Sequence, residues 1–210
     1  LLGRADPSGK LATTWAKWED YGKLGEFGDP DETRYREGIY VGYRYFDTAG
    51  VKAPYPFGFG LSYTDFAVRV LKTAAEGSRV TVTASVENTG KTAGREVLQV
   101  YVSVPGGRLD QPYQVLAAFR KTDPIQPGSS QTVQASFDLR ELASYDAENA
   151  SYILEAGDYI VRAGNSSVHT VPAAVLSLSE SVSVKKVRNT LGDCGFADWK
   201  PQTRKTEAPA

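Results

Sequence analysis

Alternation of apolar and polar residues dominates the middle of the chain, from about residue 65 to residue 178. Apolar side chains recur at every second position through 66–70 and 80–86, which is the period of a strand with one buried face. Further alternating runs follow near residues 115–121, 131–137, 151–155, 158–163 and 168–178. Turn residues separate them, including Asn88-Thr-Gly90, Pro105-Gly-Gly107, Pro127-Gly128 and Gly164-Asn165. Short strands punctuated in this way predict a mainly β fold, an antiparallel immunoglobulin-like or fibronectin-III-like β-sandwich.

One run, residues 97–104, is apolar on both of its faces. Val97 and Tyr101 fall on one face, while Leu98, Val100 and Val102 fall on the other. A strand of this kind is normally covered on both sides. We therefore predict that it is central in the sandwich.

Two stretches near the end of the chain depart from the alternation. Asp138-Leu-Arg-Glu-Leu142 predicts a single helical turn crossing between the sheets, with Asp138 as its N-cap. Residues 180–210 lose the pattern and finish in Pro, Gln, Lys, Thr and Ala, a composition typical of linkers. We expect 180–210 to be a linker or tail.

The first 63 residues follow a different pattern. Residues 1–36 carry scattered large aromatics without a sustained period, which indicates irregular chain that lies on another surface. Residues 38–46 alternate and predict a strand, with Ile39 and Tyr43 among the side chains of one face. Proline and glycine follow at 54–60, so that piece should be extended, outside the central strands, and sharply turned.

These patterns predict three regions. Residues 1–63 form an aromatic-rich, largely irregular segment with one or two strands, 64–179 form the sandwich, and 180–210 form the tail. Trp15 and Trp18 could offer an exposed sugar platform, but we favour packing on a neighbouring domain. Without that domain they should leave an exposed apolar patch.

Composition and charge remove several classes of function. The chain has 24 basic and 25 acidic residues, so nothing points to a nucleic-acid module or to an anionic membrane as partner. The single cysteine, Cys194, excludes an internal disulfide, and the single histidine, His169, excludes a two-histidine metal site. No metal or cofactor is expected. The absence of methionine from 210 residues that begin at Leu1 favours an internal piece of a longer polypeptide.

Candidate chemistry is sparse along the chain. Glu37, Arg44 and Asp47 stand beside aromatic residues, as residues of sugar sites often do. The alternative, which we favour, is that they serve ion pairing and packing around a strand. Glu96 and Gln99 are expected to bind backbone groups, and His169 is expected at the surface or an interface.

Several motifs together resemble glycoside hydrolase family 3. They are the segment Pro7-Ser-Gly-Lys-Leu11, the aromatic run Glu37–Asp47, Pro56–Thr64, the β motif Val86-x-Asn88-x-Gly90-x-x-x-Gly94-x-Glu96-Val97-x-Gln99-x-Tyr101, Leu116-x-x-Phe119, Ser144-Tyr-Asp146, and Gly157-Asp-Tyr159 with Gly164-Asn-Ser-Ser167. The ordered set spans about residues 1–178. The resemblance places 1–63 at the end of the family's α/β sandwich domain and the β region in its fibronectin type III-like domain.

The resemblance implies a parent enzyme of the β-glucosidase type, which hydrolyses terminal β-linked glucosides with retention through two carboxylates. Both carboxylates would lie outside this chain, so no catalytic residue is assigned within it. Residues expected near the substrate in the parent are Tyr43, Arg44, Tyr45 and Asp47. Residues expected to carry the structural motif are Asn88, Gly90, Gly94, Glu96, Gln99, Tyr101, Gly157 and Tyr159.

Three alternatives stay open at the level of sequence. The parent could be circularly permuted, with the tail leading to a following barrel, or the tail could be an extended C-terminus. The chain could instead be a stand-alone immunoglobulin-like carbohydrate-binding or adhesion module. Expected partners are the rest of the parent glycosidase and, in the full protein, its glycoside; cytoplasmic and exported locations are both compatible with the sequence.

Overall fold

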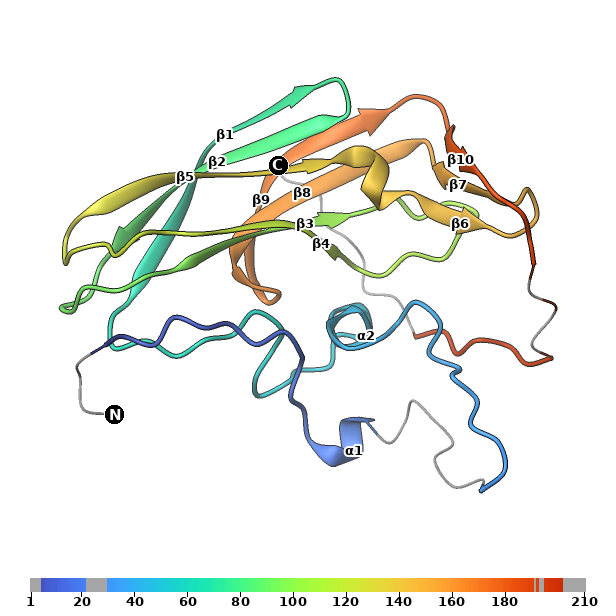
Figure 1. Ribbon diagram of the computed structural model, residues 1–210, viewed down its shortest axis with the longest axis horizontal. Helices are drawn as coiled ribbons and strands as arrows, with labels where there is room; N and C mark the ends of the chain where they lie inside the picture. Colours follow the sequence, from blue (N-terminus) through green and yellow to red (C-terminus); the bar gives the residue numbers. More distant parts are fainter. Residues whose placement is uncertain (1–4, 22–29, 191, 193–194, 202–210) are drawn as a thin grey trace.

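The computed structural model describes residues 5–21, 30–190, 192 and 195–201, and its centre is the predicted β-sandwich. One sheet has the order β1-β2-β5, built from Phe66–Glu76, Arg79–Asn88 and Ser130–Asp138. The facing sheet has the order β4-β3-β8-β9, built from Val115–Lys121, Val97–Ser103, Gly157–Ser166 and His169–Leu178. All strand pairs in both sheets are antiparallel, which confirms the predicted fold class (Figure 1).

The core between the sheets comes from the alternating positions. In β2 every second residue, from Val80 to Val86, is buried. These side chains join Leu98, Val100 and Val102 of β3 in one cluster. Burying a valine side chain stabilises a fold by about 1.5–3 kcal/mol relative to leaving it exposed, so the alternation alone determines which face turns inward.

β3 is central, as predicted, because all seven of its residues are buried. Its inner face enters the core, while Gln99 and Tyr101 lie on the other face. There they contact the N-terminal segment, since Tyr43 packs edge-to-face on Tyr101 and Gln99 donates to the carbonyl of Gly58. The N-terminal segment therefore forms a third layer against this sheet (Figure 1).

The predicted strand at 38–46 is wrong. Residues Tyr43–Ala49 form the helix α2, which ends at Gly50 in the left-handed conformation. Tyr45 and Phe46 are buried next to each other in a second apolar cluster with Tyr40. Packing of adjacent residues into one cluster suits a helix, whereas a strand would send them to opposite faces. A short helix, α1, spans Trp18–Tyr21. Before β1, Trp15 and Tyr55 pair in an isolated antiparallel bridge.

The late part of the chain is more ordered than a free linker. The predicted turn is confirmed as the 3₁₀ helix η1 at Leu139–Leu142, with the Asp138 side chain accepting from the Arg140 amide. A third small sheet follows, in the order β10-β7-β6, from Val182–Lys186, Ser151–Leu154 and Ser144–Asp146. β10 lies in the region expected to be a tail, and its short Val-Ser-Val run gave too little alternation to identify it. The three predicted domain boundaries stay a prediction.

The tail also returns to α2. The Trp199 amide donates to the Arg36 carbonyl at 2.6 Å, and the Trp199 ring packs on Tyr45 at 5.1 Å between centroids. Lys200 forms an ion pair with Asp110 at 2.7 Å. Residues 195–201 thus lie against the N-terminal layer, whereas Cys194 falls outside the described residues. In the part of the chain that the structure describes, no helix has the length and apolar character to cross a membrane.

Candidate functional site at the seam between the N-terminal segment and the sandwich

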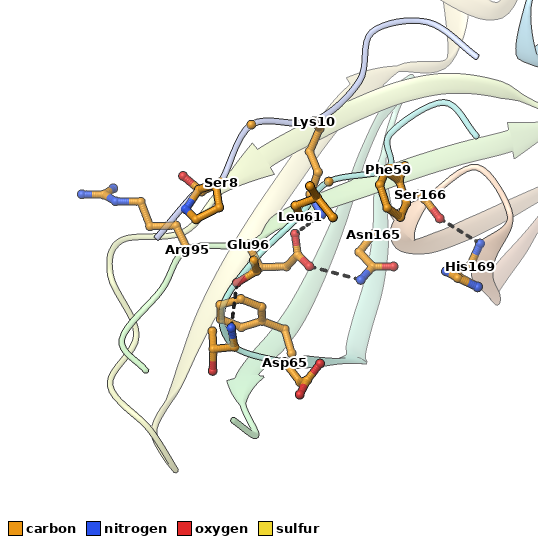
Figure 2. Close-up of a pocket in the computed structure, with 16 residues that line it drawn as sticks. Ser8, Lys10, Phe59, Leu61, Asp65, Arg95, Glu96, Asn165, Ser166 and His169 are labelled. Carbon is orange, nitrogen blue, oxygen red and sulfur yellow. Dashed lines mark hydrogen bonds and ion pairs between the residues drawn. The ribbon is translucent and has the colours of Figure 1, made fainter. Parts of the chain in front are cut away.

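A polar seam joins the N-terminal layer to the sandwich, and Glu96 is at its centre (Figure 2). Glu96 is only 5% exposed. Its Oε1 accepts from the Lys10 ammonium at 2.6 Å and from the Val97 amide at 2.7 Å. Its Oε2 accepts from the Asn165 side-chain amide at 3.1 Å. A buried carboxylate needs such partners to offset its lost hydration, so this ion pair fixes the Pro-Ser-Gly-Lys segment on β3 and β8.

Gln99 makes the next set of links along the seam. Its Nε2 donates to the Gly58 carbonyl at 3.1 Å and to the Asn165 carbonyl at 2.7 Å. Its Oε1 accepts from the Tyr101 hydroxyl at 2.7 Å. Burial is the main cause that raises the pKa of Tyr101, so this phenol stays a neutral donor. The predicted binding of backbone by Gln99 is confirmed.

Gly58 must be glycine for this contact to form. Its φ is +79°, and a Cβ there would lie 2.0 Å from the Gln99 Oε1. Side chains are strongly disfavoured both by that backbone conformation and by that distance. The Pro-Phe-Gly-Phe-Gly run therefore brings its backbone directly onto the side chain of Gln99.

A cavity of about 350 Å³ opens along the seam. Lys10, Phe59, Leu61, Glu96 and His169 are among its lining residues (Figure 2). The buried carboxylate of the cavity, Glu96, is already engaged by three donors. Within the described residues no group of three or more His, Cys, Asp or Glu could hold a metal ion. The arrangement is suited to fastening two layers together.

The Asn88 turn secures the entry into the sandwich. The Asn88 Oδ1 accepts from the Thr64 hydroxyl at 2.6 Å and from the Gly90 amide at 3.1 Å, while its Nδ2 donates to the Ile125 carbonyl at 2.8 Å. A Cβ on Gly90 would lie 2.2 Å from the Thr64 Oγ1, and Gly94 pairs with Ile125 in an isolated bridge. This part of the predicted motif is a buried, hydrogen-bonded turn.

The remaining motif residues stabilise the far end of the sandwich. The Tyr159 hydroxyl donates to the Glu155 carbonyl at 2.8 Å, and burial raises the pKa of Tyr159 to about 12. The Glu155 carboxylate accepts from the backbone amides of Arg108 and Leu109 at 2.8 and 3.1 Å. Gly157 has a φ of +135° and lies against Pro105, where a Cβ would come within 2.7 Å. Together these contacts hold the loop between β3 and β4.

The four residues expected near a substrate share α2 but do not converge on one site. Tyr43 stacks on Phe57 at 4.5 Å between centroids, and its hydroxyl accepts from the Leu116 amide at 2.8 Å. Tyr45 is buried against Trp199. Asp47 is buried and accepts from the Gln114 Nε2 at 2.9 Å. Arg44 alone points to an exposed surface. Proximity to a substrate therefore stays a prediction for these residues.

Sequence reasoning missed two residues of the N-terminal interface. Gln114 is fully buried and links the Asp47 carboxylate to the Ser167 carbonyl, which accepts from its Nε2 at 2.6 Å. Asn165 connects Glu96 with Gln99. A single glutamine or asparagine beside a strand carries no distinctive signal, because its partners come from distant parts of the chain. His169 is exposed, as expected.

Comparisons with known proteins agree with this architecture. Residues 96–167 match the fibronectin type III-like domain. The chain is 42% identical to beta-glucosidase A of Butyrivibrio fibrisolvens and 43% identical to a beta-glucosidase of Ruminococcus albus, over 70% of its length in both cases and over 20% and 16% of theirs. Among solved structures, a Paenibacillus barengoltzii beta-glucosidase matches with a TM-score of 0.84 and 40% identity, covering 89% of this chain and 22% of that one.

A second solved structure, a Bifidobacterium adolescentis GH3 beta-glucosidase, matches with a TM-score of 0.78 and 33% identity over 90% of this chain and 28% of its own. The similarity therefore includes the N-terminal layer as well as the sandwich. The chain spans about a fifth of the length of the curated relatives that it matches.

Proposed function

Because this chain carries the fibronectin type III-like domain of the glycoside hydrolase family 3 type, we propose that it is a non-catalytic, bracing part of a longer β-glucosidase-like enzyme. In that enzyme, terminal β-linked glucosides are hydrolysed with retention by carboxylates outside this chain. The partner of this chain is the remainder of the same enzyme. The identities of 42–43% to named beta-glucosidases, over only 16–20% of their length, support this reading.

The observation that carries the proposal is the polar seam. Glu96, next to β3, and Gln99 of β3 direct buried hydrogen-bonding groups at Lys10 and Gly58, so the sandwich holds the N-terminal segment in place. The outward side of that segment exposes Trp15, Trp18 and Tyr35 by 61%, 84% and 76%. Exposed aromatic side chains on a firmly held segment favour the interpretation that another protein surface covers them in the longer enzyme.

The purified chain tests the proposal directly. We expect no hydrolysis of 4-nitrophenyl β-D-glucoside above the buffer blank at any pH between about 4 and 8, because neither catalytic carboxylate is present. Turnover by a preparation of verified purity, abolished by a substitution within the chain, would contradict the non-catalytic role. Sequencing the natural transcript across both ends gives the second test. A barrel pattern before or after this chain would support a longer glycosidase. A barrel that follows the chain would indicate a circularly permuted enzyme, and a barrel that precedes it would exclude that arrangement.

The stand-alone binding or adhesion module is the competing function. Such a module should fold without residues 1–63. Removing them would expose Gln99 and Tyr101, which are buried by the N-terminal layer. We expect the truncated chain to lose cooperative unfolding or to aggregate. A truncated chain that unfolds cooperatively with the full free energy of unfolding would favour the module instead.

A further inference from the structure

A second cavity, of about 530 Å³, lies where α2, the β3–β4 loop, η1 with β6, and the returning tail meet. We refer to it as the corner groove. Its volume falls within the range of small-molecule sites, about 300–1,000 Å³. It shares no lining residue with the seam cavity, which is lined by residues 7–10, 59–66, 95–96 and 165–169.

The corner groove has an apolar floor. Its aliphatic lining residues are Ile39, Val104, Leu109, Val115, Leu116 and Leu142. Tyr145 adds a ring that is 43% exposed and lies beside its cross-strand neighbour Tyr152, at 5.4 Å between centroids. A flat ring beside aliphatic side chains offers a surface for an apolar molecular face.

The charges around the floor nearly balance. Lys200 and Asp110 pair with each other at 2.7 Å. The other charged lining residues are Arg44, Glu141 and Asp198, one cation against two carboxylates. Such a rim has little net field to attract a strongly anionic or cationic ligand. Uncharged hydroxyl groups, in contrast, can accept from a guanidinium and donate to a carboxylate.

Arg44 and Glu141 are available for such a ligand. Neither side chain makes a hydrogen bond or ion pair within the part of the chain that the structure describes, and both are exposed. They come from α2 and from η1, which lie far apart in sequence. Only the docking of the N-terminal layer on the sandwich places them on the same groove.

From these observations we propose that the corner groove binds an uncharged glycoside that carries an apolar aglycone. The aglycone and the apolar face of the sugar ring rest on the aliphatic floor and on Tyr145, and the hydroxyls bond to Arg44 and Glu141. This assigns a ligand to a part of the molecule for which the proposed function gives only a bracing role. The inference rests on the proposed function for the choice of a glycoside as the ligand.

The tail is the wall that completes the groove. Asp198 and Lys200 line it, and they are held by the Trp199 amide bonded to the Arg36 carbonyl and by the Trp199 ring on Tyr45. The Asp198 Oδ2 lies so close to Gly38 that a Cβ there would be at 2.5 Å. Residues 195–201 thus form one side of the groove.

Titration of the whole chain with 4-nitrophenyl 1-thio-β-D-glucoside, followed by amide NMR shifts, tests the inference. A thioglucoside resists hydrolysis, so the result does not depend on whether the chain has activity. We expect saturable shifts at 39–44, 109–116 and 141–145, with a Kd of the order of 1 mM. Arg44→Ala and Tyr145→Ala should each raise the Kd about fivefold or more, and Glu141→Gln about threefold.

The controls separate the groove from the rest of the surface. Lys72→Ala, on the exposed face of β1, should leave the Kd unchanged. Raising the salt concentration should also leave the Kd of the wild-type chain unchanged, because the ligand is uncharged. Glucose 6-phosphate should bind no more tightly than the thioglucoside. Four outcomes would each overturn the proposal. Two concern the shifts, which could be linear and non-saturating or confined to the seam cavity. The other two are equal affinity for 4-nitrophenol alone and full binding by both Arg44→Ala and Tyr145→Ala. Unchanged amide dispersion in β2 and β3 verifies that the variants fold.

Discussion

At the scale of single residues, buried polar groups account for the attachment of the N-terminal layer. The Glu96 carboxylate receives donors from the N-terminal segment, from the first residue of β3 and from β8. The neutral amide of Gln99 donates to the carbonyls of Gly58 and Asn165 and accepts from the Tyr101 hydroxyl. Removing one partner from such a set is costly, because the group left behind stays buried without compensation.

We predict that Lys10→Ala lowers the free energy of unfolding by about 3 kcal/mol, because it leaves the Glu96 carboxylate buried without its cation. Urea unfolding followed by tyrosine and tryptophan fluorescence measures the change. Lys121→Ala is the matched control. Lys121 is an exposed lysine that donates to the Ser8 carbonyl of the same segment, so its loss should cost about 0.5 kcal/mol or less. Equal effects of the two substitutions would show that the Glu96 pair has no special weight.

Asp146 should make stability depend on pH in the acid range. Hydrogen bonding to Arg108 lowers the pKa of Asp146 to about 2, and Asn149 contributes in the same direction. Its pKa in the unfolded chain is about 3.9. A folded-state pKa below the unfolded one stabilises the fold above the unfolded pKa, and that stabilisation is lost as pH falls through the folded pKa. The contribution of Asp146 is therefore full above about pH 5 and disappears between about pH 4 and 2.

Urea unfolding of the wild-type chain and of Asp146→Asn across that range checks the prediction. The difference between their free energies of unfolding should be constant near neutral pH and should shrink below about pH 4. Glu148→Gln removes the exposed partner of the same Arg108 and should change stability by at most about 0.5 kcal/mol. A wild-type minus Asp146→Asn difference that is flat down to pH 2 contradicts the assignment.

At the scale of elements, the N-terminal layer depends on close backbone approach as much as on side chains. The Pro-Phe-Gly-Phe-Gly run reaches β3 because Gly58 has no side chain at the point of contact. α2 lies beside it, held by Tyr43 on Phe57 and by Asp47 bonded to Gln114. Residues 195–201 then cover the opposite side of α2 through Trp199.

Gly58→Ala should therefore cost more than the same change at a glycine of similar conformation. Gly58 and Gly77 have φ values of +79° and +58°, but a Cβ would meet Gln99 at 2.0 Å in the first case and nothing within 4 Å in the second. We expect a loss of about 1 kcal/mol for Gly77→Ala, from backbone strain alone, and more than about 2 kcal/mol for Gly58→Ala. Thermal and urea unfolding of the two variants provide the measurement, and equal losses would mean that Gln99 can move aside.

At the scale of the whole molecule, the N-terminal layer is bonded to the sandwich on one side and carries exposed aromatic residues elsewhere. The bonded side is the seam, where the N-terminal layer meets β3 and β8. The exposed aromatic residues of this layer include Trp15, Trp18 and Tyr35. Exposure of the two tryptophans agrees with the expectation that a neighbouring domain covers them in a longer protein.

These exposed aromatic side chains should promote dye binding and self-association of the isolated chain. Replacing Trp15 and Trp18 together by serine should reduce both the fluorescence of a bound apolar dye and the concentration-dependent self-association measured by light scattering. Because both side chains are largely exposed, the free energy of unfolding should change by no more than about 0.5 kcal/mol. Phe119→Ser, at an exposed aromatic residue on β4, serves as the control for removal of any surface ring. A large loss of stability in the double variant would mean that the tryptophans pack within this chain.

Local pattern was enough to predict the sandwich, because a period of two at Val80–Val86 and an apolar run on both faces at 97–103 leave few other ways to bury those side chains. It also determined the Asp138 cap, which depends on neighbouring residues alone. Other features depend on partners that are distant along the chain and come together only in the folded molecule. Residues 43–49 form a helix that packs in a cluster including Trp199, and β10 pairs with β7. Gln114 lies between Asp47 and Ser167. Docking of the layers also brings Arg44 and Glu141 to one groove. Local periodicity cannot encode contacts of this kind, because their energy comes from residues tens of positions away that meet only after the layers have docked.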